Sequence, residues 1–385
     1  MKVLYAGKNI NHHQVPFVKS LSKLIGIDNI RYASLKMVEP ERLKMGFEQF
    51  SGELFIDINK SYQDFLEWWF EADIVVTNIR HYYDLMEQRL KKGKILFYTS
   101  ERWFKKPIGT LRLLHPNIMK LTYEYRKLSD YQHFYYLPQG YFAYRDFKLL
   151  GICKNKSYSF GYITPQINNK VIALDKNIMP QDKTNILWAG SLIKLKNVDI
   201  LAKAFVEINR RFPSTYLTII GEGPERDYIS KILSECKSRD CYCIKNFVEN
   251  SQLRYIMSKS DIYVFPSNGA EGWGAVVNEA MSEGCAVVLA SKIGARTMIT
   301  HGVNGLVFKD GSVMSLILQL TELISNQNIL KQIKTNSQRT ICDEWNSDIA
   351  AERFLYLCDS LRNNATYNDN GFTLLKHITE LDYND

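Results

Sequence analysis

The sequence lacks the patterns that place a protein in a membrane or send it through one. No apolar run reaches the roughly 18 residues of a spanning helix, and the run Val3–Ala6 near the start is too short for the core of a signal peptide. We therefore expect a cytoplasmic protein, free or held peripherally on the inner face of the plasma membrane. No low-complexity stretch predicts long disorder.

Cysteine is scattered rather than paired. The chain of 385 residues has seven cysteines, and the nearest two, Cys241 and Cys243, have only one residue between them. Zinc sites usually combine two pairs with wider spacing, so we expect reduced thiols and no structural zinc. No Asp-x-Asp pair has a context that indicates a metal. We expect no cofactor and no obligatory metal.

Basic charge is concentrated in one part of the chain. The formal net charge is +8, and between Arg80 and Lys127 twelve basic residues stand against four acidic ones. Such a region attracts phosphates, nucleic acid or anionic lipid, although a charge run is more commonly a solvated helix face. No nucleic-acid reader motif accompanies it, so we expect no nucleic-acid partner. We favour peripheral contact of the basic region with an anionic membrane.

Apolar β-type runs alternate with helical patterns throughout, which predicts parallel sheets covered by helices. In the first half we expect strands at 2–5, 73–77, 95–99, 134–137 and 158–162, and helices at 17–24 and 81–91. In the second half we expect strands at 186–189, 216–220, 242–246, 262–265 and 286–290. Helices are expected at 198–211, 225–236, 252–258, 275–283, 313–325, 329–343 and 348–361.

This order of elements predicts an α/β protein with two Rossmann-like domains that face each other across a cleft. The domains would be residues 1–165 and 184–345, and the polar stretch 166–183 would be the linker between them. We expect a helix at 346–363 to pack back towards the first domain, and 364–385 to be a loose tail. Ligands of open parallel sheets bind at the carboxyl ends of the strands.

The most informative segment runs from Pro266 to Met281, where a strand ends in a glycine-containing loop and a helix begins. Gly272 and Gly274 permit close approach of a ligand to the backbone, and the helix start offers N–H groups suited to a diphosphate. Glu271 in the loop and Glu279 in the helix can accept hydrogen bonds from sugar hydroxyls. A diphosphate between two hydroxyl-bearing rings is a nucleotide-sugar.

This segment resembles the Glu-x7-Glu signature of retaining glycosyltransferases of family 4, which belong to group 1 and have the GT-B fold. The resemblance implies that Glu271 contacts the donor sugar and Glu279 holds the ribose. It implies that the diphosphate meets the backbone amides of Gly272, Trp273, Gly274 and Ala275. In such a protein the first domain would bind the acceptor and the second the nucleotide-sugar.

Further motifs of the same family surround the signature. Trp188–Asp199 resembles the family's element with a phosphate-binding lysine, which is Lys196 here, and it contributes Gly190 and Ser191 to the expected donor site. Gly221 begins a Gly-x-Gly-Pro motif, and Phe247 and Val248 resemble the segment that holds the base.

One position departs from the family pattern. A phosphate-binding arginine of the family is Ser191 here, which removes a fixed bidentate cation from the expected donor site. Lys194 or a basic residue of the first domain would have to replace it. The departure keeps open a weakened or inactive member of the family.

In the first domain the resemblance rests on fewer residues. The loop with Asn-His-His-Gln-x-Pro-Phe, which contains His12 and His13, resembles bacterial enzymes of surface and capsular polysaccharide synthesis. Where many relatives have a Gly-Gly phosphate loop the chain has only Gly7, which we assign to the donor. Either histidine could bind the acceptor hydroxyl or the leaving phosphate. Alternatively, both are exposed imidazoles that precede a helix.

The strand end at Ser100, Glu101 and Arg102 supplies further candidates. Glu101 could orient an acceptor hydroxyl and Arg102 a phosphate, or Ser100 could cap the next helix with Glu101 in its first turn. The aromatic residues Trp103 and Phe104 beside lysines could dip into a membrane interface. We favour a place for them in the core of the domain.

These observations predict a retaining glycosyltransferase of the hexosyltransferase type. It would move a sugar from a nucleotide-diphosphate sugar, UDP-linked, to a glycan or polyprenyl-diphosphate-linked acceptor in bacterial surface polysaccharide synthesis. We assign catalysis to His13, Glu101, Lys196 and Glu271. Two alternatives stay open: a nucleotide-sugar 2-epimerase, and a non-catalytic nucleotide-sugar-binding subunit of a glycosyltransferase complex.

Overall fold

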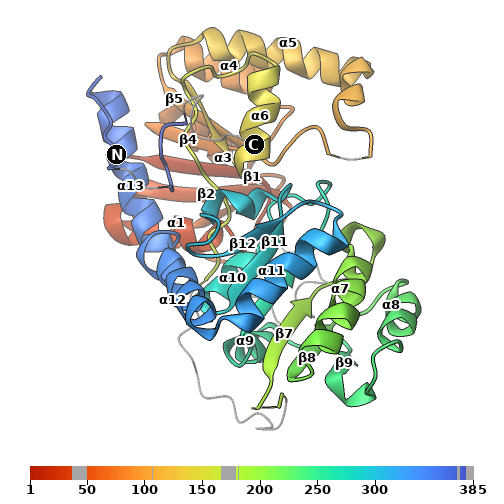
Figure 1. Cartoon of the computed structure of the whole chain (residues 1–385). Coiled ribbons are helices and arrows are strands. Elements are labelled where there is room, and N and C mark those ends of the chain that lie inside the picture. The colour runs from red at the N-terminus through yellow and green to blue at the C-terminus, as the bar shows by residue number, and fades with distance from the viewer. Residues whose placement is uncertain (37–49, 106, 166–178, 181, 371–372, 379–385) are drawn as a thin grey trace. The chain divides into compact units, whose positions relative to one another are not determined.

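The computed structural model describes residues 1–36, 50–105, 107–165, 179–180, 182–370 and 373–378 and divides into two compact units (Figure 1). Unit 1 comprises Met1–Pro165 and Glu344–Asp385, and unit 2 comprises Gln166–Asp343. Most of the predicted linker, 166–183, lies outside the described residues.

Unit 1 contains a six-stranded parallel sheet in the order β3-β2-β1-β4-β5-β6. The strand order reverses beside β1, which lies between β2 and β4. Most strand residues are buried, as expected for a parallel sheet covered on both faces. The strands are β1 (Val3–Asn9), β2 (Ile30–Lys36), β3 (Phe55–Asp57), β4 (Ile74–Thr77), β5 (Ile95–Ser100) and β6 (Phe134–Pro138).

Six described α-helices and two 3₁₀ turns complete unit 1. They are α1 (Val15–Ile25), η1 (Ile27–Asn29), α3 (Tyr62–Glu71), α4 (Tyr83–Lys91), η2 (Gly109–Leu114), α5 (Pro116–Asp130), α6 (Tyr141–Leu149) and α13 (Ser347–Arg362). The C-terminal helix α13 packs on α1, where Ser20 Oγ donates a hydrogen bond to Asp348 at 2.5 Å and Phe17 meets Phe354 edge to face.

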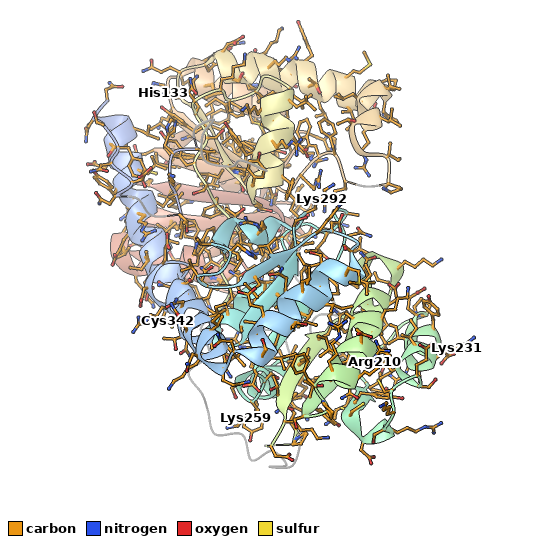
Figure 2. All side chains as sticks on the ribbon, viewed as in Figure 1. His133, Arg210, Lys231, Lys259, Lys292 and Cys342 are labelled. Atoms are coloured by element: carbon orange, nitrogen blue, oxygen red, sulfur yellow. The ribbon has the colours of Figure 1, made fainter. Side chains whose placement is uncertain are left out.

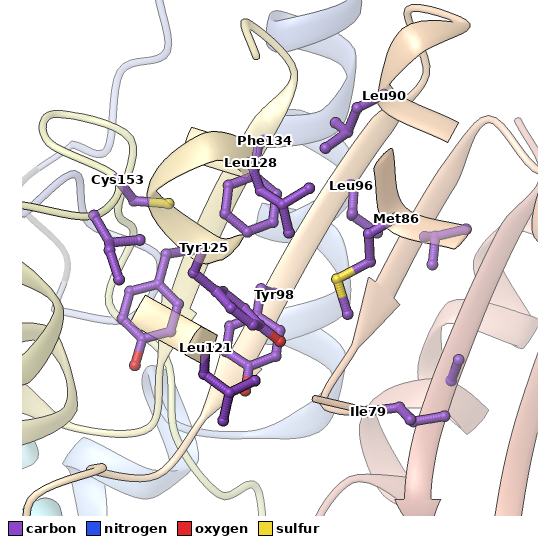
Figure 3. Packing of buried hydrophobic residues seen from close by; sticks show 14 of the residues in the cluster. Ile79, Met86, Leu90, Leu96, Tyr98, Leu121, Tyr125, Leu128, Phe134 and Cys153 are labelled. Carbon is purple, nitrogen blue, oxygen red and sulfur yellow. The ribbon is translucent and has the colours of Figure 1, made fainter. Parts of the chain in front are cut away.

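The core of unit 1 lies where α4 and α5 cover the sheet. In Figure 3, Met86 and Leu90 of α4 and Leu121, Tyr125 and Leu128 of α5 surround Leu96 and Tyr98 of β5. The buried positions of α5 are spaced by three and four residues, which places them on one face of the helix.

Two predictions for unit 1 are wrong. The segment 158–162 forms isolated bridges to neighbouring segments instead of a strand. The prediction of a loose tail at 364–385 is wrong for 373–378, because Leu374 and Leu375 are fully buried and the Ser159 N–H donates to the Lys376 carbonyl at 2.8 Å, whereas most residues of 364–370 are exposed. The apolar side chains of this short segment are covered by unit 1 despite the polar sequence around them.

Unit 2 repeats the same topology. Its six parallel strands have the order β12-β11-β10-β7-β8-β9, so the order reverses between β7 and β10. The strands are β7 (Thr184–Ala189), β8 (Thr215–Ile220), β9 (Tyr242–Lys245), β10 (Ile262–Phe265), β11 (Ala286–Ala290) and β12 (Leu306–Phe308). The α-helices are α7 (Val198–Arg211), α8 (Arg226–Leu233), α9 (Asn250–Ser258), α10 (Val276–Ser282), α11 (Val313–Ser325) and α12 (Gln327–Asp343).

The seven cysteines are free thiols, as expected, and Cys342 is exposed on α12 (Figure 2). Within the described residues, no helix is both long enough and apolar enough to cross a bilayer.

Candidate functional site

The candidate site in unit 2 lies at the point where the strand order of the sheet reverses. β7 and β10 are neighbours there, and Tyr263 of β10 donates a hydrogen bond from its hydroxyl to the Ala189 carbonyl of β7 at 3.2 Å. Open parallel sheets bind ligands at such a point, beyond the carboxyl ends of the strands. The loops that follow the two strands carry Lys196 and Glu271.

Lys196 and Glu271 form an ion pair although they are far apart in the sequence. Lys196 Nζ donates to Glu271 Oε2 at 2.5 Å, and the two side chains are 20% and 16% exposed. The Asn268 N–H donates to the Leu195 carbonyl at 3.0 Å, which joins the two loops beside the ion pair. A lysine and a carboxylate are thus held together with part of each still accessible.

The carbonyl groups of the loop between Glu271 and α10 are held by the segment at Gly294. The Gly294 and Ala295 N–H groups donate to the Gly272 and Trp273 carbonyls at 3.1 and 2.9 Å. A Cβ on Gly294 would lie 2.7 Å from the Gly272 oxygen, so this approach requires glycine. Among the described residues, the N–H groups of Gly272, Gly274 and Ala275 have no acceptor. Gly272 and Ala275 are partly exposed, so their amides are accessible to an anion, whereas Gly274 is buried.

Trp273 does not offer its side chain to a ligand. The indole is fully buried, and its Nε1 donates to Asn278 Oδ1 of α10 at 2.7 Å. The predicted donor contact of Trp273 therefore cannot involve the side chain. The indole instead anchors the loop to the helix that follows it.

Glu279 lies on α10, close to a buried ion pair between Arg254 of α9 and Glu283, whose atoms are 2.8 Å apart. Burial raises the pKa of Glu279 above its ordinary value, and the nearby Glu283 raises it further, while Arg254 and a hydrogen bond with Asn250 oppose the rise. The carboxylate is therefore held in a place that favours a proton or a hydrogen-bond donor. A ribose hydroxyl would be such a donor.

Two glycines bring the ends of β7 and β8 into close contact. Gly221 has φ of +149°, and a Cβ there would lie 1.8 Å from the Gly190 oxygen. The neighbouring Ser191 and Lys194 are exposed, so either is accessible to a ligand at the position of the missing arginine. Phe247, beyond the end of β9, is 52% exposed, and Val248 is partly buried.

A second cluster lies in unit 1 and joins three segments. The His13 ring stacks on Tyr162 with centroids 5.0 Å apart, and Tyr162 Oη donates to Glu101 Oε1 at 2.8 Å. Lys105 Nζ donates to the other oxygen of Glu101 at 2.5 Å. The structure thus brings His13 and Glu101 together through Tyr162, which sequence reasoning did not select. We call His13, Glu101 and Tyr162 the unit 1 cluster.

Other residues predicted in unit 1 are placed differently. Ser100 ends β5 and its buried hydroxyl is hydrogen-bonded to Tyr136 at 3.0 Å, which does not fit the alternative of a helix cap. Arg102 lies against Asp146 and the Phe142 ring, and burial lowers its pKa. Gly7 lies inside β1, paired with Ser34, and not in a loop, because β1 extends to Asn9.

His12 is buried, with only 6% of its surface exposed, so the alternative of two exposed imidazoles does not hold for it. Its ring meets His13 edge to face at 5.1 Å. For metal binding, the described residues contain no cluster of three or more His, Cys, Asp or Glu side chains. The independence from metal stays a prediction.

Comparison with known proteins identifies unit 2. The family model described as "Glycosyl transferases group 1" matches residues 172–340. Residues 172–340 are a group 1 glycosyltransferase domain. The Lys196–Glu271 pair, the loop at 272–275 and Glu279 all belong to this glycosyltransferase domain.

Relatives extend the likeness beyond the glycosyltransferase domain. An uncharacterised glycosyltransferase of Methanocaldococcus jannaschii is 24% identical over 306 residues, which cover 76% of each chain. The poly(glycerol-phosphate) alpha-glucosyltransferase of Bacillus subtilis is 26% identical over 48% of this chain, but the match covers only 26% of that protein.

Among solved structures, Anabaena HepE in complex with UDP covers 94% of this chain and all of its own, with a TM-score of 0.65 at 14% identity. At this identity the likeness shows the fold, which is GT-B, with the glycosyltransferase domain as one of its two α/β parts.

Proposed function

We propose that the chain is a retaining glycosyltransferase of the hexosyltransferase type. The glycosyltransferase domain would bind a nucleotide-diphosphate sugar, UDP-linked, and unit 1 would bind the acceptor. The observation that carries this proposal is the Lys196–Glu271 ion pair at the reversal point of the unit 2 sheet, beside three backbone amides that have no acceptor among the described residues. This arrangement offers a cation and N–H donors to a diphosphate and a carboxylate to the sugar next to it.

In the proposed reaction, the acceptor hydroxyl attacks the anomeric carbon from the same face as the departing diphosphate. The bond from the anomeric carbon to the diphosphate oxygen breaks, a bond to the acceptor oxygen forms, and the acceptor proton passes to the leaving diphosphate. Negative charge grows on the diphosphate, so Lys196 and the amides of Gly272, Gly274 and Ala275 would stabilise the transition state more than the ground state. Glu271 would hold the lysine and the donor sugar.

The unit 1 cluster is our candidate for the acceptor contact. Glu101 has both oxygens oriented by donors at 2.5 and 2.8 Å, which fixes the carboxylate for a hydroxyl that approaches it. The stacked pair of His13 and Tyr162 offers an aromatic surface beside it. A carboxylate next to aromatic rings suits a sugar, which has hydroxyls on its edge and C–H groups on its faces.

The choice of donor and acceptor class is supported by the relatives. The HepE structure was obtained with UDP, which supports a UDP-sugar donor. The Bacillus subtilis relative is named for transfer of glucose to poly(glycerol-phosphate), which supports a surface glycan or a lipid-linked precursor as acceptor. The action of the chain in bacterial surface or capsular polysaccharide synthesis is our proposal on these grounds.

Proton NMR of the purified chain with a UDP-sugar tests the reaction type. A retaining transferase without acceptor should release the sugar slowly, with the donor's anomeric configuration appearing first, before mutarotation. Inversion at the anomeric carbon would contradict retention. Inversion at C2 of the intact donor would identify a 2-epimerase instead. An unchanged donor, with acceptor glycans also supplied, would indicate a non-catalytic binding subunit.

A further inference from the structure

Exposed apolar side chains gather on one part of unit 1, where η2 leads into α5. Of the sixteen large hydrophobic residues that are exposed among those described, five lie between positions 108 and 123. Their exposed fractions run from 53% to 77%, the highest being that of Leu114. We call the set the η2–α5 surface, which consists of Ile108, Leu111, Leu114, Met119 and Tyr123.

These side chains are exposed although other residues of α5 are buried in the core of unit 1. α5 already buries one face, with Leu121, Tyr125 and Leu128 packed into the core of unit 1 (Figure 3). Met119 and Tyr123 are one turn apart on another face, where they remain 59% and 61% exposed. On this face of α5 the described residues of unit 1 leave Met119 and Tyr123 uncovered, which is typical of an interaction surface.

The charges beside this surface are mostly positive. Between position 108 and the end of α5 the chain has Arg112, Lys120, Arg126 and Lys127 and two acidic residues, Glu124 and Asp130. The Lys120 side chain is 76% exposed, with its Nζ 3.6 Å from Glu124 Oε1, while the Glu124 side chain is only 16% exposed. Lys127 Nζ lies over the Tyr123 ring, 4.9 Å from its centre, so this cation is next to one of the exposed apolar side chains.

Apolar side chains flanked by lysine and arginine match the boundary layer of an anionic bilayer. Leucine and methionine side chains can enter the acyl region, while the cations meet lipid phosphates at the surface. Lysine is depleted at protein–protein interfaces. Here Lys120 and Lys127 flank the apolar residues and basic residues outnumber acidic ones, which favours lipid.

We propose that the η2–α5 surface binds an anionic phospholipid bilayer, with Leu111 and Leu114 inserted and Lys120 and Lys127 at the headgroups. The aromatic residues Trp103 and Phe104 take no part, because each is only 2% exposed and lies in the core. Membrane contact therefore depends on the aliphatic residues that follow them in the sequence. Binding to the bilayer through this surface does not require the proposed transfer reaction.

Co-sedimentation of the full chain with lipid vesicles tests this surface without any sugar donor. We expect binding to phosphatidylcholine vesicles that contain phosphatidylglycerol, and weak binding to phosphatidylcholine alone. Leu111→Ser/Leu114→Ser should weaken the partition at least tenfold. The matched control is Met314→Ser/Leu318→Ser on α11, whose side chains are each 63% exposed, and it should bind as the wild type does.

A second variant tests the electrostatic part. Lys120→Glu/Lys127→Glu should abolish the preference for phosphatidylglycerol, and added salt should have the same effect on the wild type. Absence of binding to anionic vesicles, or equal losses in both serine variants, would overturn the proposal. So would sedimentation velocity showing a dimer that Leu111→Ser/Leu114→Ser dissolves, because the surface would then bind a second copy. Donor hydrolysis should be unchanged in all these variants, which separates this test from that of the reaction.

Discussion

Replacement of Lys196 by alanine should lower both the rate of donor hydrolysis and the free energy of unfolding, and the two effects can be measured separately. The lysine is the cation of an ion pair with a 2.5 Å contact, and it lies beside the amides proposed to hold the diphosphate. Loss of one preorganised group that stabilises charge in a transition state typically costs about 10²–10³ in rate. We expect a decrease of that size in kcat/KM for donor hydrolysis.

The stability effect follows from burial of the pair. Exposed pairs contribute about 0–1 kcal/mol, and removal of one partner from a fully buried pair costs about 3–5 kcal/mol. With 20% and 16% of the side chains exposed, we expect Lys196→Ala to cost about 1–3 kcal/mol, measured as the free energy of unfolding. Lys203→Ala is the matched control, because its pair with Asp199 is 42% and 29% exposed, and it should change little.

The double variant Lys196→Ala/Glu271→Ala distinguishes the two roles. It removes the carboxylate left without its partner, so part of the stability should return, while activity should remain low. Recovery of activity in the double variant would refute the reasoning, since the lysine would then act only by neutralising Glu271. An activity loss no larger than that of Lys203→Ala would refute it equally.

Three further predictions concern single side chains. Burial raises the pKa of Glu279, so the ionised carboxylate destabilises the fold above that pKa. Glu279→Gln should therefore have a higher melting temperature than the wild type at pH 8, and the difference in melting temperature should shrink towards pH 5. A difference that does not depend on pH would contradict this. Tyr162→Phe removes the 2.8 Å hydrogen bond to Glu101, so KM for the acceptor should rise while the rate of donor hydrolysis stays constant. Equal decreases in the rates of transfer and of donor hydrolysis would argue against an acceptor role. Gly221→Ala would place a Cβ 1.8 Å from the Gly190 oxygen and should cost at least about 2 kcal/mol in the free energy of unfolding, whereas wild-type stability in urea titrations would show that the two loops can separate.

Much of unit 2 could be predicted because its strands are short apolar runs with clear ends. The strands at Ile262–Phe265 and Ala286–Ala290 have the predicted bounds, since a proline or a polar loop follows each. Strand β12, of three residues, was missed because so short a run has no detectable period. β2 was missed because arginine, serine and lysine interrupt its apolar pattern.

The unit 1 cluster could be predicted only in part. His13 and Glu101 follow strands, so their place at the carboxyl edge of a parallel sheet follows from topology. Tyr162 comes from a segment that was predicted as a strand, and its ring reaches His13 only because the chain returns along that edge. Contacts of this kind depend on the tertiary fold, which local patterns do not encode.

The exposure of individual apolar side chains could not be predicted from the sequence either. Trp103 and Phe104 precede Leu111 and Leu114 by fewer than a dozen residues, and both pairs are strongly apolar, yet the first pair is buried and the second is 67% and 77% exposed. The difference arises because the rings of Trp103 and Tyr125 pack edge to face in the core, whereas η2 runs over the outside of unit 1.

The central claim is that the glycosyltransferase domain binds and activates a nucleotide-sugar through Lys196, Glu271 and Glu279. The most direct test is thermal melting and donor hydrolysis of the full chain with a panel of UDP-, GDP- and ADP-sugars. We expect stabilisation and slow hydrolysis with a UDP-sugar, both lost in Lys196→Ala and Glu279→Ala and retained in Lys203→Ala. An unchanged melting temperature with every nucleotide-sugar, or equal stabilisation of the wild type and both site variants, would contradict it.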